Sequence, residues 1–167
     1  MTPEQHSNDV ELQQRNPQFV VSIRSIVRID QLGEVMDERM QALREFMQQR
    51  GIQPAGPPFV RYHTFGETET DLETGVPVAE PVAGEGRIVG SELPGGPVIT
   101  TWHFGSHDTL GNAYARMHAW LHEHGRTVPG AAWEVYYWID PSQYGGPAAW
   151  PAATTWGTQL IQPISES

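Results

Sequence analysis

The sequence predicts a single α+β domain of two βαββ units related by pseudo-two-fold symmetry. Their antiparallel sheet is expected to be backed by two helices, with a central ligand groove. Two segments have the apolar spacing of helices, and each ends at a glycine, Gly51 or Gly125. Segments rich in β-branched and aromatic residues lie before and after each of them. The two halves of the chain also match each other at one fixed offset.

The internal match is an offset of 74 residues. It superposes the apolar positions of the two helices, the glycines that end them, and a tyrosine in the strand that follows. The matched pairs include Met36 with Leu110, Met40 with Tyr114, Leu43 with Met117, Met47 with Leu121, Gly51 with Gly125 and Tyr62 with Tyr136. The same offset places Glu134 opposite Val60, so the packing of the repeat does not require an acid at this position. We expect repeats of about 18–83 and 84–167 within one domain, 18–167.

The individual elements follow from local pattern. Helices are predicted over 34–50 and from Asp108, as the capping residue, to Gly125. Proline and glycine pairs mark the turns between strands. The predicted strands are 18–29, 59–65, 71–82, 87–92, 97–104, 131–140 and 158–164, and 141–157 is a loop rich in Gly, Pro and Ala. Residues 1–17 are polar and are predicted to form a flexible tail, too short for a helix-turn-helix.

The segment from Ala131 to Asp140 is the most informative part of the chain. Side chains alternate along a strand, so Trp133, Val135, Tyr137 and Ile139 are expected on one face as ordinary core. Glu134, Tyr136 and Trp138 are expected on the other. A carboxylate among aromatic side chains costs several kcal/mol unless it is paired, hydrogen-bonded or protonated. This cost makes Glu134 the first candidate for function, with an ordinary structural acid bonded to an amide or an arginine as the alternative.

Composition excludes several classes of function. The formal net charge of −10 disfavours direct binding of nucleic acid, whose phosphates are also negative, and it serves solubility as readily as it attracts cations. No cysteine is present, which excludes disulfides, thiol catalysis and zinc-thiolate sites. No apolar run is long enough for a membrane span, and residues 1–17 lack the apolar segment of a signal peptide. A cytoplasmic protein is expected, and a homodimer is compatible with the sequence.

Several motifs in order along the chain are similar to the GyrI-like small-molecule-binding domain, the effector module of AraC- and MerR-type multidrug regulators. They are Leu93-Pro94-Gly95-Gly96, His103-Phe104-Gly105, Tyr114 with Trp120-Leu121, Trp133-Glu134-Val135-Tyr136, and the 161–164 strand. In the first half, residues 71–78 resemble the family's acidic segment followed by Val-Pro-Val. The resemblance covers about 19–164. Ser106-His107 departs from the proline and aromatic pair that often follows this glycine in the family.

The resemblance implies a groove lined by aromatic residues, with an acid that meets cationic or polar drugs. It also implies a second possibility, because some stand-alone members look like hydrolases that open cyclopropane-bearing DNA-alkylating compounds in an aromatic cage. From the residues themselves, a binder of planar, hydrophobic, often cationic molecules is favoured, acting in sequestration or resistance. In a hydrolase, Glu134 and Tyr136 would be the catalytic pair. A third reading is an interaction module that docks on a regulator through an exposed apolar patch.

The candidate ligand-binding residues are one acid and a set of aromatic side chains. They are Glu134, Tyr136, Trp138, Trp102, Tyr62, Tyr144, Trp150 and Trp156. For Tyr136 and Trp138 simple packing is the alternative, and Trp102 could point to either face of its strand. The aromatic residues of the 141–157 loop are expected to fold over the groove as a lid, or to pack on a neighbouring chain.

No metal or cofactor is predicted. His118 and His122 stand four residues apart on a predicted helix, with His124 nearby, and this spacing can bind a metal ion. Both flank the apolar stripe and no third ligand is evident, so a solvated face is the preferred interpretation. The glycines at 84, 86 and 90 do not have dinucleotide-binding spacing, and no serine or threonine has an evident His and acid partner.

Overall fold

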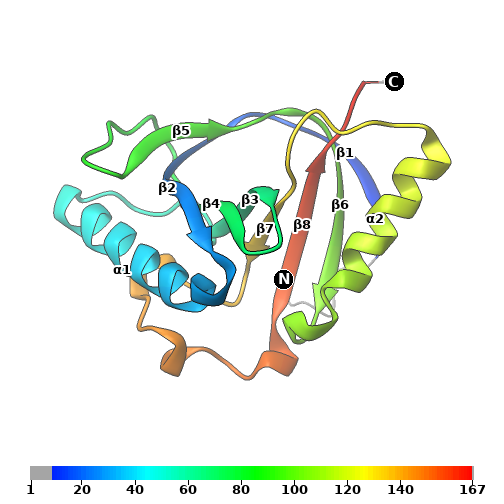
Figure 1. Ribbon diagram of the computed structural model, residues 1–167. Helices are drawn as coiled ribbons and strands as arrows, with labels where there is room; N and C mark the ends of the chain where they lie inside the picture. The colour runs from blue at the N-terminus through cyan, green and yellow to red at the C-terminus, as the bar shows by residue number, and fades with distance from the viewer. Residues whose placement is uncertain (1–8, 167) are drawn as a thin grey trace.

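The computed structural model describes residues 9–166 and shows an α+β fold with one eight-stranded sheet and two long helices (Figure 1). The strands are β1 (Glu11–Arg15), β2 (Gln18–Arg28), β3 (Phe59–Phe65), β4 (Glu69–Pro77), β5 (Val89–Leu93), β6 (Gly96–Phe104), β7 (Trp133–Tyr136) and β8 (Gly157–Pro163). The helices are α1 (Leu32–Arg50) and α2 (Gly111–His124). Within residues 9–166, neither helix is long and apolar enough to cross a membrane.

The sheet is antiparallel throughout, in the order β1-β6-β8-β7-β3-β4-β2-β5. The two halves meet at its centre, where β3 pairs with β7. Val60 lies directly opposite Glu134 there, with Phe59 opposite Val135 and Arg61 opposite Trp133. Val60 and Glu134, which correspond in the two repeats, therefore lie at the pseudo-two-fold axis, and the flanking pairs Phe59–Val135 and Arg61–Trp133 are related to each other by it, which confirms the predicted symmetry of two βαββ units.

The outer strands are exchanged between the halves. β1 precedes β2 in the chain but pairs with β6, and β5 precedes β6 but pairs with β2. The expected flexible tail over residues 1–17 is therefore wrong for 11–15, which form β1; residues 1–8 lie outside the described residues. β1 can be polar because it is an edge strand, which is held by backbone hydrogen bonds to a neighbour on one side only.

Each helix ends as the sequence indicates. Gly51 and Gly125 take left-handed conformations with φ of 65° and 61°, and their N–H groups bond to carbonyls of the last turn. The start of α2 differs from the prediction. The Ser106 side chain, and not Asp108, accepts the capping hydrogen bond, and a short 3-10 turn (His107–Thr109) comes before α2.

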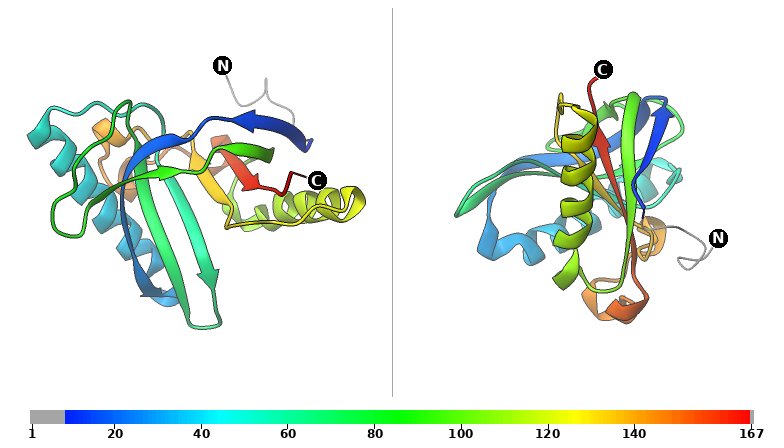
Figure 2. Two further views of the ribbon diagram at one scale, coloured as in Figure 1. Left: turned by 90° about the horizontal axis from the view of Figure 1, so that it is seen from above. Right: turned by 90° about the vertical axis from the view of Figure 1, so that its right-hand side faces the viewer.

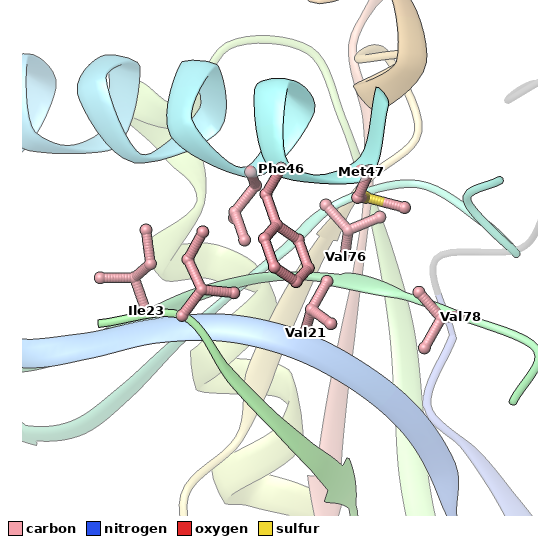
Figure 3. Close-up of a cluster of buried hydrophobic side chains, with 8 residues drawn as sticks. Val21, Ile23, Phe46, Met47, Val76 and Val78 are labelled. Atoms are coloured by element: carbon pink, nitrogen blue, oxygen red, sulfur yellow. The ribbon is translucent and has the colours of Figure 1, made fainter. Parts of the chain in front are cut away.

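Both helices cover the same face of the sheet. Figure 3 shows Phe46 and Met47 of α1 over Val21 and Ile23 of β2 and Val76 of β4. In the other half of the sheet, on the same face, α2 packs its buried residues Ala113 and Met117 on Ile99 and Leu160. Because Leu160 pairs with Glu134 and Glu134 pairs with Val60, these side chains share the helix-covered face. Glu134 thus lies near the middle of the sheet, between the parts covered by the two helices.

Within residues 9–166, no helix lies on the opposite face, which folds on itself as the sheet curls. Its buried residues come from six strands: Val20, Phe59, Leu93, Val98, Trp133 and Ile161. In the view from above, the β3–β4 hairpin projects past the helices (Figure 2). The segment between β7 and β8 contains three short 3-10 turns and runs along the lower edge from α1 toward β8 (Figure 1).

Candidate functional site

Glu134 is buried and held by two tyrosine hydroxyls. Its side chain is only 4% exposed. The Tyr114 hydroxyl from α2 donates to Oε2 at 2.5 Å, and the Tyr136 hydroxyl from β7 donates to Oε1 at 2.7 Å. Both carboxylate oxygens are therefore satisfied without an arginine. Arg61 on the facing strand, an arginine that could have paired with Glu134, donates to the Ala131 carbonyl and lies over the Trp133 ring.

Burial dominates the electrostatics of this carboxyl group. Desolvation raises the pKa of Glu134 above its usual value, while the hydrogen bonds from Tyr114 and Tyr136 oppose the rise. Burial and the nearby Glu134 charge also raise the pKa values of Tyr62 and Tyr136, so both remain protonated hydroxyls. The site is an acid surrounded by neutral hydrogen-bond donors.

A wall of stacked aromatic rings continues from Tyr136. Trp138 lies 5.2 Å from the Tyr136 ring, between centroids, and stacks on Trp156 at 3.9 Å with an angle of 5°. Trp150 meets the edges of both tryptophans, at 5.1 and 5.9 Å. Offset and edge contacts of this kind contribute about 0.5–1.5 kcal/mol each beyond the area they bury. Residues from the turn after β7 and from the following loop thus build one continuous cluster with the tyrosine that holds Glu134.

His107 completes this cluster from the turn before α2. Its ring lies 5.3 Å from Tyr136, 5.7 Å from Trp138 and 5.1 Å from Trp156, between centroids. Nε2 is 2.9 Å from Thr158 Oγ1. Burial lowers the pKa of His107 to about 4, with a contribution from nearby His103, so the imidazole is neutral at pH 7. His107 therefore lies among the aromatic rings as a neutral ring, at the position where the sequence departs from the family's Pro–aromatic pair.

The predicted strand 131–140 is too long. β7 ends at Tyr136, and the Ile139 N–H bonds to the Tyr136 carbonyl in a turn that leads into Asp140-Pro141. The turn ends the alternation of faces. Ile139, expected behind the strand, is buried in the same cluster as Tyr136, whereas Tyr137 is 50% exposed on the other side. Proline fixes the backbone and lacks an N–H, which favours a turn over a longer strand.

Two further predicted residues have different surroundings. Trp102 lies on the helix-free face, stacked on Phe104 at 6.0 Å and 4.8 Å from the Tyr137 ring, so it is not brought to Glu134. Tyr144 is buried in the cluster that contains Tyr136, and its hydroxyl donates to Asp37 of α1 at 2.6 Å. Tyr144 thus fastens the 137–156 segment to α1.

Sequence reasoning missed two residues of the site. The helical spacing assigned Tyr114 to the core. A signal was present in the repeat: Met40, which corresponds to Tyr114, has no hydroxyl, and Val60, which corresponds to Glu134, has no carboxylate. His107 appeared only as a departure from the family pattern. Its proximity to the tryptophans depends on the conformation of the long loop, for which the sequence carries no periodic signal.

The histidines of α2 do not converge. His118 and His122 are exposed, and His124 stacks on Trp120 at 3.9 Å. In the described part of the chain, no three His, Cys, Asp or Glu side chains form a group that could hold a metal ion.

Comparison with solved structures gives the same fold. The EcmrR C-terminal domain aligns with a TM-score of 0.76 and 21% identity over 95% of this chain and 98% of that domain. The EcmrR chain in its DNA complex aligns with a TM-score of 0.77 and 22% identity, but only 58% of that chain is covered. This chain thus spans little more than half the length of that regulator.

Two other neighbours cover nearly all of both chains. A structure described as a hydrolase from Listeria innocua has a TM-score of 0.66 and 12% identity over 96% of this chain and 93% of that one. SAV2435, solved with tetraphenylphosphonium bound, has a TM-score of 0.61 and 12% identity over 95% and 94%. No curated protein sequence matches the chain. The model of the GyrI-like small molecule binding domain matches residues 8–145, and the chain belongs to that family.

Proposed function

We propose that this protein binds aromatic cations, and neutral aromatic molecules that carry hydrogen-bond donors, at the site formed by Glu134, its two tyrosines and the tryptophan cluster. The observation that carries the proposal is the buried carboxylate of Glu134, whose hydrogen-bond partners within residues 9–166 are two tyrosine hydroxyls. A charge in this position costs several kcal/mol in the free protein. A bound cation would offset that cost, so the site favours positive ligands over neutral ones.

The aromatic wall supplies the second part of the selectivity. Ring faces attract cations through their quadrupoles, worth about 0.5–2 kcal/mol per contact depending on desolvation. Trp138, Trp150 and Trp156 offer such faces and edges within one cluster next to Tyr136. A similar fold bound to tetraphenylphosphonium, an aromatic cation, supports this ligand class. All of these residues come from one chain, so a monomer suffices for the proposed binding, which would act by sequestering its ligand.

We place the entrance at the 137–156 segment. Glu134 is covered by other side chains, so a ligand reaches it only when some of them move. Trp150 and Trp156 each directly follow a short 3-10 turn, Pro147–Ala149 and Ala153–Thr155, and Tyr144 anchors the segment to α1. Movement of the two tryptophans about that anchor would open the site and then close it over the ligand.

Titration with tetraphenylphosphonium, followed by tryptophan fluorescence and by calorimetry, tests the proposal. We expect saturable one-to-one binding that weakens in Glu134→Gln and in Trp138→Ala. Glu123→Gln is the matched control, because Glu123 is an exposed acid on α2 and loses the same charge. Absence of binding for tetraphenylphosphonium, rhodamine 6G and several neutral aromatics alike would remove the proposal.

A second candidate function is hydrolysis of cyclopropane-bearing alkylating compounds. The observation in its favour is that one site combines a carboxyl group of raised pKa, two tyrosine hydroxyls and a neutral imidazole. Water would attack a ring carbon as its C–C bond breaks. In a compound whose ring is conjugated to a dienone, the electron pair would move to the dienone carbonyl oxygen, which takes a proton from solvent, while the attacking water loses one to Glu134, which then releases it to solvent.

Mass spectrometry separates hydrolysis from binding. Catalysis requires a product heavier than the substrate by one water, formed in amounts that exceed the protein. Glu134→Gln should abolish that turnover if Glu134 accepts the proton. Stoichiometric protection of the compound without a hydrated product would leave binding as the function.

A further inference from the structure

A hollow lies on the helix-free face of the sheet, behind the strand that carries Glu134. Its volume is about 440 Å³, within the range of about 300–1,000 Å³ that is usual for small-molecule sites. Trp133 and Glu134 are neighbours on β7 and point to opposite faces, so the hollow is distinct from the tyrosine and tryptophan site. Its lining residues include Arg15, Phe59, Trp133, Val135, Tyr137 and Gln159.

About half of the wall of the hollow is apolar, and this part centres on β7 and β3. Trp133 and Val135 of β7 lie beside Phe59 of β3, which pairs with Val135 directly. Tyr137 is half exposed at the rim, where a ring of a ligand could stack on it. The turns before β2 and β6, through Pro17 and Pro94, close two other sides. A planar hydrocarbon group is the chemistry that such walls accept.

Arg15, the charged residue in the lining of the hollow, is a hydrogen-bond donor. Arg15 is partly buried, its pKa is lowered by that burial, and its Nε and Nη2 donate to the neutral Gln13 at 3.2 and 3.0 Å. Within residues 9–166, no carboxylate lies in ion-pair distance of Arg15. The Gln159 side chain receives only a long hydrogen bond from Tyr137, at 3.4 Å. The lining contains one arginine and no acid, in a chain whose net charge is −10.

We propose that this hollow binds an aromatic carboxylate, with its ring between Trp133 and Tyr137 and its carboxylate on the Arg15 guanidinium. A carboxylate matches the planar fork of arginine and accepts two parallel hydrogen bonds. It also brings one negative charge, which one arginine can neutralise, whereas a phosphate dianion would leave a charge uncompensated in an acidic protein. The two faces of β7 would thus select ligands of opposite charge.

Calorimetric titration with 2-naphthoate tests the proposal, with 2-naphthamide as its uncharged counterpart. We expect 2-naphthoate to bind the wild-type protein and Arg15→Gln to weaken this binding by roughly tenfold or more, the usual effect of losing a charge-assisted hydrogen bond. Binding of 2-naphthamide should change little. Arg28→Gln is the matched control, because Arg28 is exposed, pairs with the exposed Asp30 and loses the same charge. Tyr137→Ala should weaken both compounds, since it removes part of the wall.

Binding of 2-naphthoate in the hollow is expected to be independent of the proposed tetraphenylphosphonium site. Glu134→Gln should leave 2-naphthoate binding unchanged, and saturating tetraphenylphosphonium should not displace it. Equal affinity of 2-naphthoate for wild type and Arg15→Gln would overturn the proposal, as would loss of binding in Glu134→Gln. Circular dichroism of each variant checks the fold, and if Arg15→Gln does not fold, movement of the Trp133 indole N–H signal on titration of the wild type decides the location. An unmoved Trp133 signal would also overturn the proposal.

Discussion

Replacement of Glu134 by glutamine is the sharpest perturbation of the site because it removes the charge and keeps the shape. The amide oxygen can still accept one of the tyrosine hydrogen bonds, and the other hydroxyl can turn to accept from the amide N–H. Tyr114 and Tyr136 therefore keep partners, at the present distances of 2.5 and 2.7 Å. Any change in ligand affinity then reports the carboxylate charge more than a collapse of the site.

The size of the effect follows from burial. A cation about 5 Å from the carboxylate gains about 3 kcal/mol at an effective dielectric constant of about 20. Part of this gain is offset by desolvation of the ligand, so we expect a net loss of about 1.5–3 kcal/mol in Glu134→Gln, or roughly 10- to 100-fold in affinity. Because Glu134 is 4% exposed, added salt should screen the interaction only weakly.

The assay compares tetraphenylphosphonium with triphenylphosphine oxide, an uncharged aromatic of similar shape, on wild type, Glu134→Gln and the Glu123→Gln control. The charged compound should lose affinity in Glu134→Gln alone, while the uncharged one changes less than about threefold, which is under 1 kcal/mol. An equal loss for both compounds would show that the variant damages the wall, and the charge argument would then be wrong. An unchanged affinity for the cation would refute it directly.

Three other measurements test the electrostatics and packing of the site. The pKa of His107 is lowered to about 4, so its NMR titration should lie near pH 4, and its contribution to stability should be lost as the pH falls from its ordinary value of about 6.5 through 4. Burial raises the pKa of Glu134, so the stability of wild type relative to Glu134→Gln should fall as the pH rises above about 4.5, and Tyr114→Phe, which removes a donor to the charged form, should extend that fall to higher pH. A double-mutant cycle of Trp138→Ala and Trp156→Ala, measured by urea unfolding, should give a coupling of about 0.5–1.5 kcal/mol, and additive effects would show that the stack contributes no energy beyond burial.

The sequence predicts the regular elements well because their signals are local. The apolar spacing and Gly51 define α1 to within two residues at its start and correctly at its end. β1 could not be found this way, since an edge strand is held by backbone bonds to β6, more than 80 residues away along the chain. The exchange of β1 and β5 between the halves is invisible for the same reason, because it changes which strands pair without changing the pattern of any strand.

Within the site, the strand pattern was sufficient to single out Glu134 and Tyr136 but not their surroundings. Their alternation holds over the four residues of β7 and fails at the turn, which is why Ile139 was assigned to the wrong side. Tyr137 keeps its predicted side, but it is half exposed and not core. Trp102 shows a second limit, since a strand of mixed apolar residues does not reveal which face its tryptophan takes. Side chains from loops depend on contacts with distant elements, as His107 does.

The register at the centre of the sheet explains how a symmetric fold acquires one asymmetric site. The register places Val60 and Glu134, the equivalent strand residues of the two halves, opposite each other. In the first half, Val60 shares one buried cluster with the helix residue Met40, and an apolar pair of this kind would satisfy both halves. In the second half the same two positions are Tyr114 and Glu134, joined by a hydrogen bond. A lone acid at this position would be unsatisfied, and a lone tyrosine would bury a hydroxyl, so each substitution depends on the other. The fold tolerates the polar pair because the symmetry already provides two buried positions in contact, one on a helix and one on the central strand. A charge in the middle of the sheet, between the two helices, therefore requires the replacement of only two residues. The free-energy cost of burying that charge falls at a place where a ligand of opposite charge can offset it.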